Sequence, residues 1–255
     1  MRIIAVTSGK GGVGKTTIAL NLAVTLIQYF GKKVTLIDAN VTTSHLPLHL
    51  GLFNYAKSLN DALRGDANLL EAAVMHESGV QVIPASMNLS DLVGVDVLML
   101  KKRIEEDLLI EDFVLIDTAP GFGKEALAAL KACKEALIVS TPDLPAITDV
   151  MRAKRILEEL GVKDVYLVLN MVRGKKFELK RSEIARITEL PILAEIPYDE
   201  RFLSCLAMKK PYVTEVSYSR AKLQFLEMAS MLTKEPYELP KISLLRRLLN
   251  FFGGK

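Results

Sequence analysis

The sequence predicts an α/β protein built on a doubly wound, mostly parallel β-sheet. Short apolar runs alternate along the chain with longer segments of helical periodicity, which is the pattern of successive β-α-β units. The apolar runs show no polar alternation, so each strand is expected to be buried on both faces of the sheet. A chain of 255 residues, 50% of them hydrophobic, is long enough to form one large domain with a full core.

Each predicted strand is one apolar run, and the predicted helices are the periodic segments between the runs. The strands are expected at 2–7, 33–38, 80–84, 113–117, 136–141, 164–170 and 192–196. The helices are expected at 15–30, 58–64, 97–108, 123–132, 145–160, 181–188 and 217–232. Sheets of this kind bind ligands at the carboxyl ends of their strands. A glycine-rich loop, Asp38, Asp117 and Asn170 follow or end strands, so they are expected at that edge.

The glycine-rich loop lies between the first strand and the first helix. It reads Gly9-Lys10-Gly11-Gly12-Val13-Gly14-Lys15-Thr16-Thr17. Backbone N–H groups of such a loop and the following helix N-terminus can all point at one anion, so the loop predicts a nucleotide-phosphate site. Lys15 is expected to reach the β- and γ-phosphates, Thr16 to hold Mg²⁺, and Thr17 to bond a second phosphate. The strand before and the helix after distinguish this motif from a chance glycine-rich turn.

Lys10 is a second lysine at the start of this loop. It cannot easily fold back onto the phosphate path that Lys15 serves. It is therefore either a residue that reaches the nucleotide of a neighbouring subunit or a solvated loop lysine, and spacing alone does not choose between the two.

The segment from Lys10 to Thr17 resembles the deviant Walker A motif of the MinD/ParA family. The strand that ends at Asp38 resembles the family's second strand, and Phe113-Val114-Leu115-Ile116-Asp117 with the following Thr118-Ala119-Pro120-Gly121 resembles its Walker B strand. The resemblance extends from Met1 to about Lys234 and returns in the C-terminal tail, where it is to the MinD branch. It implies a P-loop NTPase fold of the SIMIBI type and an ATPase that binds ATP or ADP with Mg²⁺. It also implies a homodimer that sandwiches ATP, with Lys10 reaching across.

Three polar residues after the strands are candidates for metal binding and hydrolysis. Asp117 is expected beside Mg²⁺, with a helix cap or turn residue as the alternative. The resemblance implies that Asp38 begins the first switch segment, coordinates the water shell of Mg²⁺ and senses the γ-phosphate. Asn40 stands where many relatives carry a second aspartate, and an amide can orient a water but cannot accept a proton at neutral pH. Hydrolysis is therefore expected to be slow, or to depend on Asp38 or on a partner protein.

Base recognition is assigned from the resemblance alone. It implies that Asn170 bonds adenine and that Ile196-Pro197-Tyr198-Asp199 frames the ring; chemistry alone indicates only a polar strand end and a turn. The predicted catalytic residues are Lys10, Lys15, Asp38 and Asn40, and the predicted metal ligands are Thr16, Asp38 and Asp117. The predicted nucleotide-binding residues are Gly11, Gly12, Val13, Gly14, Lys15, Thr16, Thr17, Asn170, Pro197, Tyr198 and Asp199.

The cysteines, the histidines and one basic segment are expected to have structural roles. Cys133 and Cys205 are far apart and form no Cys-x-x-Cys pair, so they are expected to be small buried hydrophobic residues. His45 and His49 have the spacing of a zinc pair, but only His76 remains as a third histidine, so a loop and a short helix are expected around residues 46–51. The basic segment 173–176, with Lys180 and Arg181, is expected to be a solvated loop and helix start rather than a partner surface.

The C-terminal residues 241–255 predict an amphipathic helix, joined to a P-loop ATPase domain at 1–234 by a linker at 235–240 that contains two prolines. Its apolar side gathers Ile242, Leu244, Leu245, Leu248, Leu249, Phe251 and Phe252, opposite Ser243, Arg246, Arg247 and Asn250. The tail carries a net charge of +4 against +3 for the whole chain, which leaves −1 for the rest. Arg246 and Arg247 favour insertion at an anionic membrane surface; packing on protein is the alternative.

These observations predict an ATP-dependent, dimerising switch that hydrolyses ATP and binds membrane reversibly, as in MinD-like positioning of cell division or other machinery. The chain shows no signal peptide and no apolar run of roughly 18 residues, so a cytoplasmic protein attached to the inner face of the cell membrane is expected. The slightly acidic body predicts no nucleic-acid partner, while a protein activator or cargo is possible. The alternatives are a ParA-like DNA-partition ATPase, an iron–sulfur carrier of the same fold, and a metabolic ligase or kinase.

Overall fold

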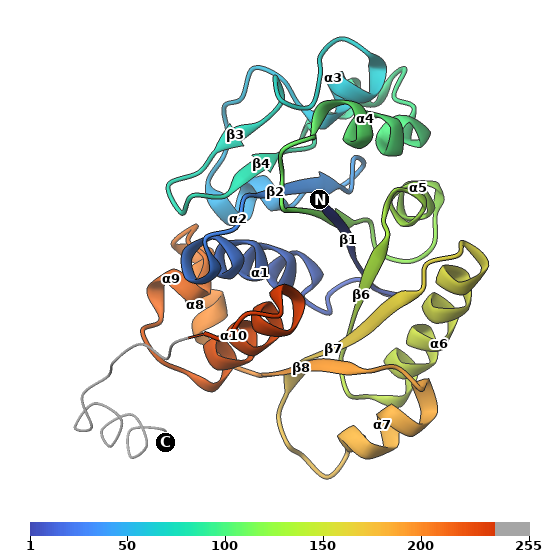
Figure 1. Cartoon of the computed structure of the whole chain (residues 1–255), viewed down its shortest axis with the longest axis vertical. Helices are drawn as coiled ribbons and strands as arrows, with labels where there is room; N and C mark the ends of the chain where they lie inside the picture. Colours follow the sequence, from blue (N-terminus) through green and yellow to red (C-terminus); the bar gives the residue numbers. More distant parts are fainter. Residues whose placement is uncertain (238–255) are drawn as a thin grey trace.

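The computed structural model describes residues 1–237, which form one eight-stranded sheet with helices on both faces (Figure 1). The strand order is β3-β4-β2-β5-β1-β6-β7-β8, and every neighbouring pair is parallel except β3 with β4. The strands are β1 (Arg2–Thr7), β2 (Val34–Ala39), β3 (Val74–Met75), β4 (Gln81–Ile83), β5 (Phe113–Thr118), β6 (Glu135–Ser140), β7 (Asp164–Val172) and β8 (Ile192–Pro197). The predicted doubly wound, mostly parallel sheet is confirmed.

The helices connect successive strands across the two faces. They are α1 (Lys15–Phe30), α2 (Leu46–Leu50), α3 (Leu59–Arg64), α4 (Leu100–Asp107), α5 (Lys124–Ala132), α6 (Leu144–Glu159), α7 (Arg181–Thr188), α8 (Arg201–Ala207), α9 (Tyr212–Glu215) and α10 (Arg220–Thr233), with two 3₁₀ turns, η1 (Leu89–Leu92) and η2 (Val97–Met99). All seven predicted strands and all seven predicted helices are present, most of them within two residues of the expected bounds.

Two predicted helices begin later than the sequence pattern suggested. The segment predicted at 97–108 starts as the 3₁₀ turn η2, which Asp96 caps by accepting a hydrogen bond from the backbone N–H of Leu98 at 3.1 Å, and the regular helix α4 begins only at Leu100. The helix predicted from residue 217 starts at Arg220, because Ser219 caps it by accepting from the N–H of Lys222 at 2.9 Å. In both cases a local side-chain bond to the backbone sets the first turn.

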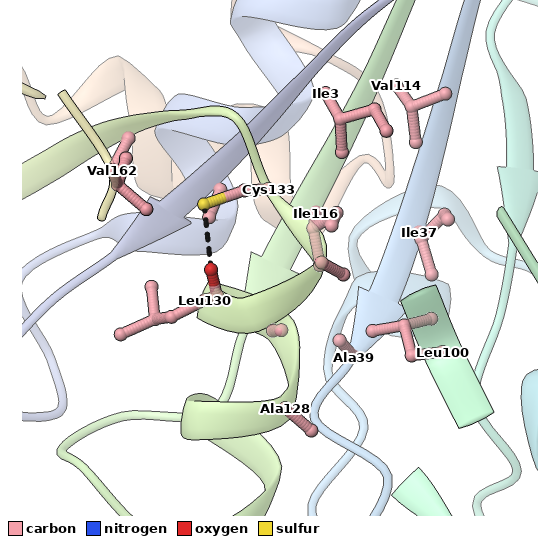
Figure 2. Packing of buried hydrophobic residues seen from close by; sticks show 14 of the residues in the cluster. Ile3, Ile37, Ala39, Leu100, Val114, Ile116, Ala128, Leu130, Cys133 and Val162 are labelled. Carbon is pink, nitrogen blue, oxygen red and sulfur yellow. Dashed lines mark hydrogen bonds between the residues drawn. The ribbon is translucent and has the colours of Figure 1, made fainter. Parts of the chain in front are cut away.

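The core consists of two apolar clusters, one on each face of the sheet. Along β1, Ile3 and Ala5 belong to the cluster under α3 to α7, while Ile4 and Val6 belong to the cluster under α1, α8, α9 and α10. Figure 2 shows part of the first cluster, where side chains of β1, β2 and β5 meet α4 and α5. Because alternate side chains of a strand point to opposite faces, a strand covered on both faces must be apolar throughout.

The end of the described chain packs against the body. The Lys32 ammonium binds the Glu235 carboxylate, the Ser230 hydroxyl donates to the Glu235 carbonyl at 2.6 Å, and Tyr237 packs on the cluster that contains α1 and α10. These contacts hold the first three residues of the predicted linker, 235–237. The remainder of that linker, 238–240, and the predicted tail helix at 241–255 lie outside the described residues. Within residues 1–237, no helix combines the length and hydrophobicity needed to span a membrane.

Candidate nucleotide-binding site

Sheet register brings the predicted site residues to one edge. Asp38 of β2 is paired directly with Asp117 of β5, and Asp117 is paired with Val6 of β1, three residues before the glycine-rich loop. Asn170 lies in β7, on the other side of β1. The carboxyl ends of parallel strands share one edge, so these residues, although far apart in sequence, surround the start of α1.

The loop itself is shaped by two close packing contacts. A Cβ on Gly9 would lie 2.3 Å from the Cβ of Asp149 on α6, and a Cβ on Gly14 would lie 2.3 Å from the Nδ2 of Asn170. Gly14 also has a φ of +86°, in the left-handed region, which favours glycine. The loop is therefore wedged between α6 and β7 and admits no larger residue at either position without displacement.

The N-terminus of α1 is available to an anion. Among the described residues, no side chain caps this end of α1, and Gly14 occupies the N-cap position. The first backbone N–H groups of a helix have no partner within the helix, and with the helix dipole they form a favourable site for phosphate. The start of α1 therefore has the geometry that the predicted phosphate site requires.

Lys15, Thr16 and Asp117 contact one another at this helix end. The Lys15 ammonium lies 2.9 Å from one oxygen of Asp117, and the Thr16 hydroxyl donates to the other at 2.6 Å. Both charged residues are buried, with Lys15 8% and Asp117 1% exposed. A hydroxyl and a carboxylate beside a phosphate site are oxygen ligands of the kind Mg²⁺ takes, so the donor set fits the predicted metal.

Asp38 is a buried carboxylate with three hydrogen-bond donors. It accepts from the Ser44 hydroxyl at 2.7 Å, from the backbone N–H of Asn40 at 3.1 Å and from that of Leu46 at 3.2 Å. Burial and the neighbouring Asp117 carboxylate raise the pKa of Asp38 to about 7. Positive charge relieves the repulsion between two adjacent buried carboxylates, which again fits a divalent cation at this edge of the sheet. The bond to Leu46 also ties Asp38 to the first residue of α2.

Asn40 is engaged inside its own loop. Its side-chain amide donates to the Thr43 carbonyl at 2.6 Å, and its amide oxygen accepts from the Thr43 hydroxyl at 3.0 Å. The residue is 7% exposed. The structure therefore shows Asn40 ordering the loop that follows Asp38, and the orienting of a water molecule by its amide stays a prediction.

Lys10 pairs with a different carboxylate from the one that Lys15 contacts. Its ammonium is 3.5 Å from Asp143, the N-cap residue of α6, and the side chains of both residues are 42% exposed. An exposed ion pair of this length is weak, so Lys10 is readily available to another partner. The contact is consistent with either of the two roles left open by the sequence.

The predicted base-binding residues line a cavity beside the loop. Asn170, Pro197, Tyr198 and Asp199 share it with Gly14 and Thr17. Asn170 is held by a 2.8 Å hydrogen bond from its amide to the Val13 carbonyl, which fixes the side chain between loop and cavity. The structure therefore brings all four together next to the glycine-rich loop.

The helices α8 and α9 supply further lining of the cavity. Neither helix was predicted from the sequence. Phe202, Leu203, Leu206 and Tyr212 line the cavity, together with His49 of α2, whose pKa is lowered by burial. The available signal was an apolar spacing in Phe202, Leu203, Cys205 and Leu206 directly after the predicted ring-framing turn. With five apolar residues among the seven of α8, that pattern was too short and too uniform to separate a helix from a turn.

The remaining predicted residues have structural roles. Cys133 is buried in the cluster of Figure 2, where its thiol donates to the Leu130 carbonyl at 3.2 Å and burial raises its pKa to about 12. Cys205 is buried in the cluster on the other face of the sheet, so both cysteines are confirmed as buried small residues. In the basic segment, Arg173 stacks on Tyr198 and Arg181 binds Glu195, so part of it lies against the body.

Comparison with known proteins agrees with this geometry. Residues 1–233 match a ParA family model described as "NUBPL iron-transfer P-loop NTPase". The chain is 33% identical over 235 residues to an uncharacterised ATP-binding protein of Methanocaldococcus jannaschii, covering 92% of this chain and 89% of that protein.

Two solved MinD structures superpose on most of the chain. The cell division ATPase MinD of Pyrococcus furiosus has a TM-score of 0.86 at 31% identity, covering 91% of this chain and 98% of that one. The septum site-determining protein MinD of Pyrococcus horikoshii, solved with Mg-ADP, has a TM-score of 0.86 at 29% identity, covering 91% and 96%. With a family model over almost its whole length and these structural neighbours, the chain belongs to the MinD/ParA family of P-loop NTPases.

Proposed function

We propose that this protein is an ATP-hydrolysing switch of the MinD type that dimerises on ATP and attaches to membrane through its C-terminal tail. The observation that carries the proposal is the buried contact of Lys15 and Thr16 with Asp117 at the uncapped N-terminus of α1, next to Asp38. Membership of a family whose Pyrococcus horikoshii member was solved with Mg-ADP supports the choice of nucleotide and metal.

Different residues of the chain would bind the phosphates and the metal ion. Backbone N–H groups of the loop and of the first turn of α1 bind the phosphates, and the Lys15 ammonium exchanges its contact with Asp117 for a phosphate oxygen. Thr16, Asp117 and Asp38 would hold Mg²⁺, and the metal would neutralise charge on the β- and γ-phosphates. Because Asp38 also binds the N–H of Leu46, a change at Asp38 is passed on to α2.

Hydrolysis is expected to be slow and to depend on Asp38 or on a protein activator. The Asn40 amide cannot take a proton from water, and in this structure it is bonded to Thr43. The substitution Asn40→Asp should raise the steady-state rate of phosphate release from ATP, because it supplies a carboxylate to activate water. An unchanged rate in Asn40→Asp would contradict this role for position 40.

Dimerisation is proposed to depend on Lys10. Its weak exposed pair with Asp143 leaves it available to the nucleotide of a second subunit. Lys10→Ala should abolish the ATP-dependent dimer measured by light scattering with a non-hydrolysable ATP analogue, whereas Lys131→Ala, an exposed lysine on α5, should leave it intact. A wild-type protein that stays monomeric with every nucleotide would refute the dimer.

Membrane attachment is proposed from the sequence of residues 241–255. Each of Arg246 and Arg247 would add about 1 kcal/mol near an anionic leaflet. One short helix binds membrane weakly and reversibly, and a dimer that presents two tails raises the effective affinity by orders of magnitude. ATP binding would therefore favour attachment, and hydrolysis would favour release.

Vesicle co-sedimentation tests the attachment. The full chain is spun with phosphatidylglycerol-containing vesicles in ADP, ATP or a non-hydrolysable analogue, with pure phosphatidylcholine vesicles as the lipid control. Leu248→Glu should abolish ATP-dependent sedimentation, because it puts a charge on the apolar side of the predicted helix. Asn250→Glu, the same charge on the polar side, should weaken it far less; equal binding by wild type and Leu248→Glu would count against insertion.

The iron-transfer role in the description of the family model is not supported by this chain's thiols. Cys133 and Cys205 are its two cysteines, and they are buried in clusters on opposite faces of the sheet. A carrier of this fold would need a pair of cysteines that can approach one cluster, so an ATP-dependent switch is the function that the residues support.

A further inference from the structure

Four residues that follow β8 form a hydrogen-bonded cluster, and two of them, Asp199 and Tyr212, also line the predicted base cavity. We call Asp199, Arg201, Tyr212 and Ser219 the Asp199 clamp. The Arg201 guanidinium donates to Asp199 from Nη2 at 2.6 Å and from Nε at 2.9 Å, and the Tyr212 hydroxyl donates to Asp199 at 2.6 Å. The cluster links the end of β8 to the starts of α8 and α9.

Hydrogen-bond donors occupy all the acceptor positions of the Asp199 carboxylate. A carboxylate offers about four acceptor positions. The backbone N–H of Arg201 donates at 3.0 Å, which together with Nε, Nη2 and the Tyr212 hydroxyl accounts for all of them. Burial alone would raise the pKa of Asp199, but the hydrogen bonds from Arg201 and Tyr212 lower it to about 2. No acceptor position is left for an amino group of a base.

The clamp continues to the last helix of the described chain. The Ser219 oxygen lies 2.9 Å from the Tyr212 oxygen and accepts from the N–H of Lys222 as the N-cap of α10. Since the single hydroxyl hydrogen of Tyr212 is donated to Asp199, the Ser219 hydroxyl donates to Tyr212. Tyr212 is 1% exposed, so its bond to Ser219 is shielded from water, whereas the Arg201 side chain at the other end of the clamp is 53% exposed. The chain of bonds connects α9 and α10 to the end of β8.

The wall formed by α8 depends on the clamp because α8 buries little of its own surface. Within α8, all of whose residues are described, Cys205 is the one buried residue, and Leu203 is 64% exposed. Phe202 stacks on Tyr212 with ring centroids 3.9 Å apart and an interplanar angle of 16°. The positions of Phe202 and Leu203 on the cavity wall are therefore set by where Tyr212 and Arg201 are held.

We infer that Asp199 is a positioning residue: through Arg201 and Tyr212 it sets the shape of the apolar wall that receives the purine ring of a nucleoside triphosphate, and it makes no bond to the base itself. The inference rests on the proposed function, because it requires a nucleotide in this site. It assigns Asp199 an indirect role, whereas the family resemblance implied that Asp199 belongs to the segment that frames the ring.

Comparison of two ligands separates an effect on the base from an effect on the phosphates. Binding of ATP and of inorganic tripolyphosphate is measured by calorimetry on the full chain with Mg²⁺. Asp199→Asn should weaken ATP binding about tenfold, equivalent to about 1.4 kcal/mol. Tripolyphosphate affinity should be unchanged, because the loop and α1 are untouched. Glu195→Gln is the matched control: Glu195 lies in β8, shortly before Asp199, and also pairs with an arginine, Arg181, but it does not line the cavity.

A second variant distinguishes positioning from direct contact. Tyr212→Phe removes one donor to Asp199 and keeps the ring that stacks on Phe202. Tyr212→Phe should also weaken ATP binding. The loss of binding free energy in the double variant should be smaller than the sum of the losses in the two single variants. The inference is overturned if Tyr212→Phe binds ATP as the wild type does, if Asp199→Asn does so, or if Asp199→Asn weakens both ligands equally. A wild-type protein that binds neither ligand would overturn the proposed function and this inference with it.

Discussion

A pair of glycine substitutions in the phosphate loop measures how tightly Asn170 packs on it. Gly12 and Gly14 both have left-handed backbones, with φ of +80° and +86°. A Cβ on Gly12 meets nothing within 4 Å, whereas a Cβ on Gly14 would be 2.3 Å from Asn170 Nδ2. Left-handed strain costs about 1–2 kcal/mol in either position. Gly14→Ala additionally displaces Asn170 from the Val13 carbonyl, which adds about 1 kcal/mol.

Urea unfolding of the nucleotide-free protein measures the two losses. Gly12→Ala should lower the free energy of unfolding by about 1 kcal/mol, since the alanine also reduces the entropy of the unfolded chain and so offsets part of the strain. Gly14→Ala should lower it by about 2 kcal/mol or more. In an Asn170→Ala background the excess at Gly14 should disappear, because the clashing amide is gone. Equal losses for the two glycines in the wild-type background would refute the steric reasoning.

Three further predictions concern the clamp and the core. The lowered pKa of Asp199 stabilises the fold above the ordinary carboxyl value of 3.8, and this contribution is lost as pH falls toward 2. Because the Arg201 side chain is 53% exposed, solvent screens part of this contribution, and Asp199→Asn should lower the free energy of unfolding by about 1 kcal/mol at pH 7 and by much less at pH 2; urea unfolding showing equal losses at both would contradict the assignment. Cys133, buried and with its pKa raised to about 12, should react with iodoacetamide at pH 8 on the order of a hundredfold slower than in urea, and rapid native labelling would disprove its burial. Phe225→Ala, at a fully buried ring, should cost about 3–5 kcal/mol in unfolding free energy, against about 0.5 kcal/mol for Phe177→Ala at a 76% exposed ring; similar losses would show that the two environments are misassigned.

Local sequence was enough to predict the elements that carry a continuous signal. The strands were found because parallel strands covered on both faces, such as β1 and β5, are apolar throughout. The phosphate loop was found because its glycines and Lys15 are contiguous. Asp38 and Asp117 were assigned to one edge because each follows a strand, and the register confirms that they are paired.

Short or weakly buried elements gave no such signal. The strand β3 has two residues and pairs antiparallel with β4 at the sheet edge. The helix α8 buries one residue, so its apolar spacing was not distinguishable from that of a turn. The hydrogen-bond partners of polar side chains were likewise not predictable from the sequence. The Asn40 amide donates to Thr43, and the Asp199 carboxylate accepts from Arg201 and Tyr212.

The amino-acid sequence by itself determined the fold class, the positions of the strands and the chemistry available at their ends, because these depend on residues that are neighbours along the chain. The tertiary structure alone decided the strand order, the pairing of Lys15 with Asp117 across 102 positions, and the closing of the base cavity by α8 and α9. Those features depend on which distant segments pack together to bury apolar surface, and a periodicity read within a short window contains no information about its partner.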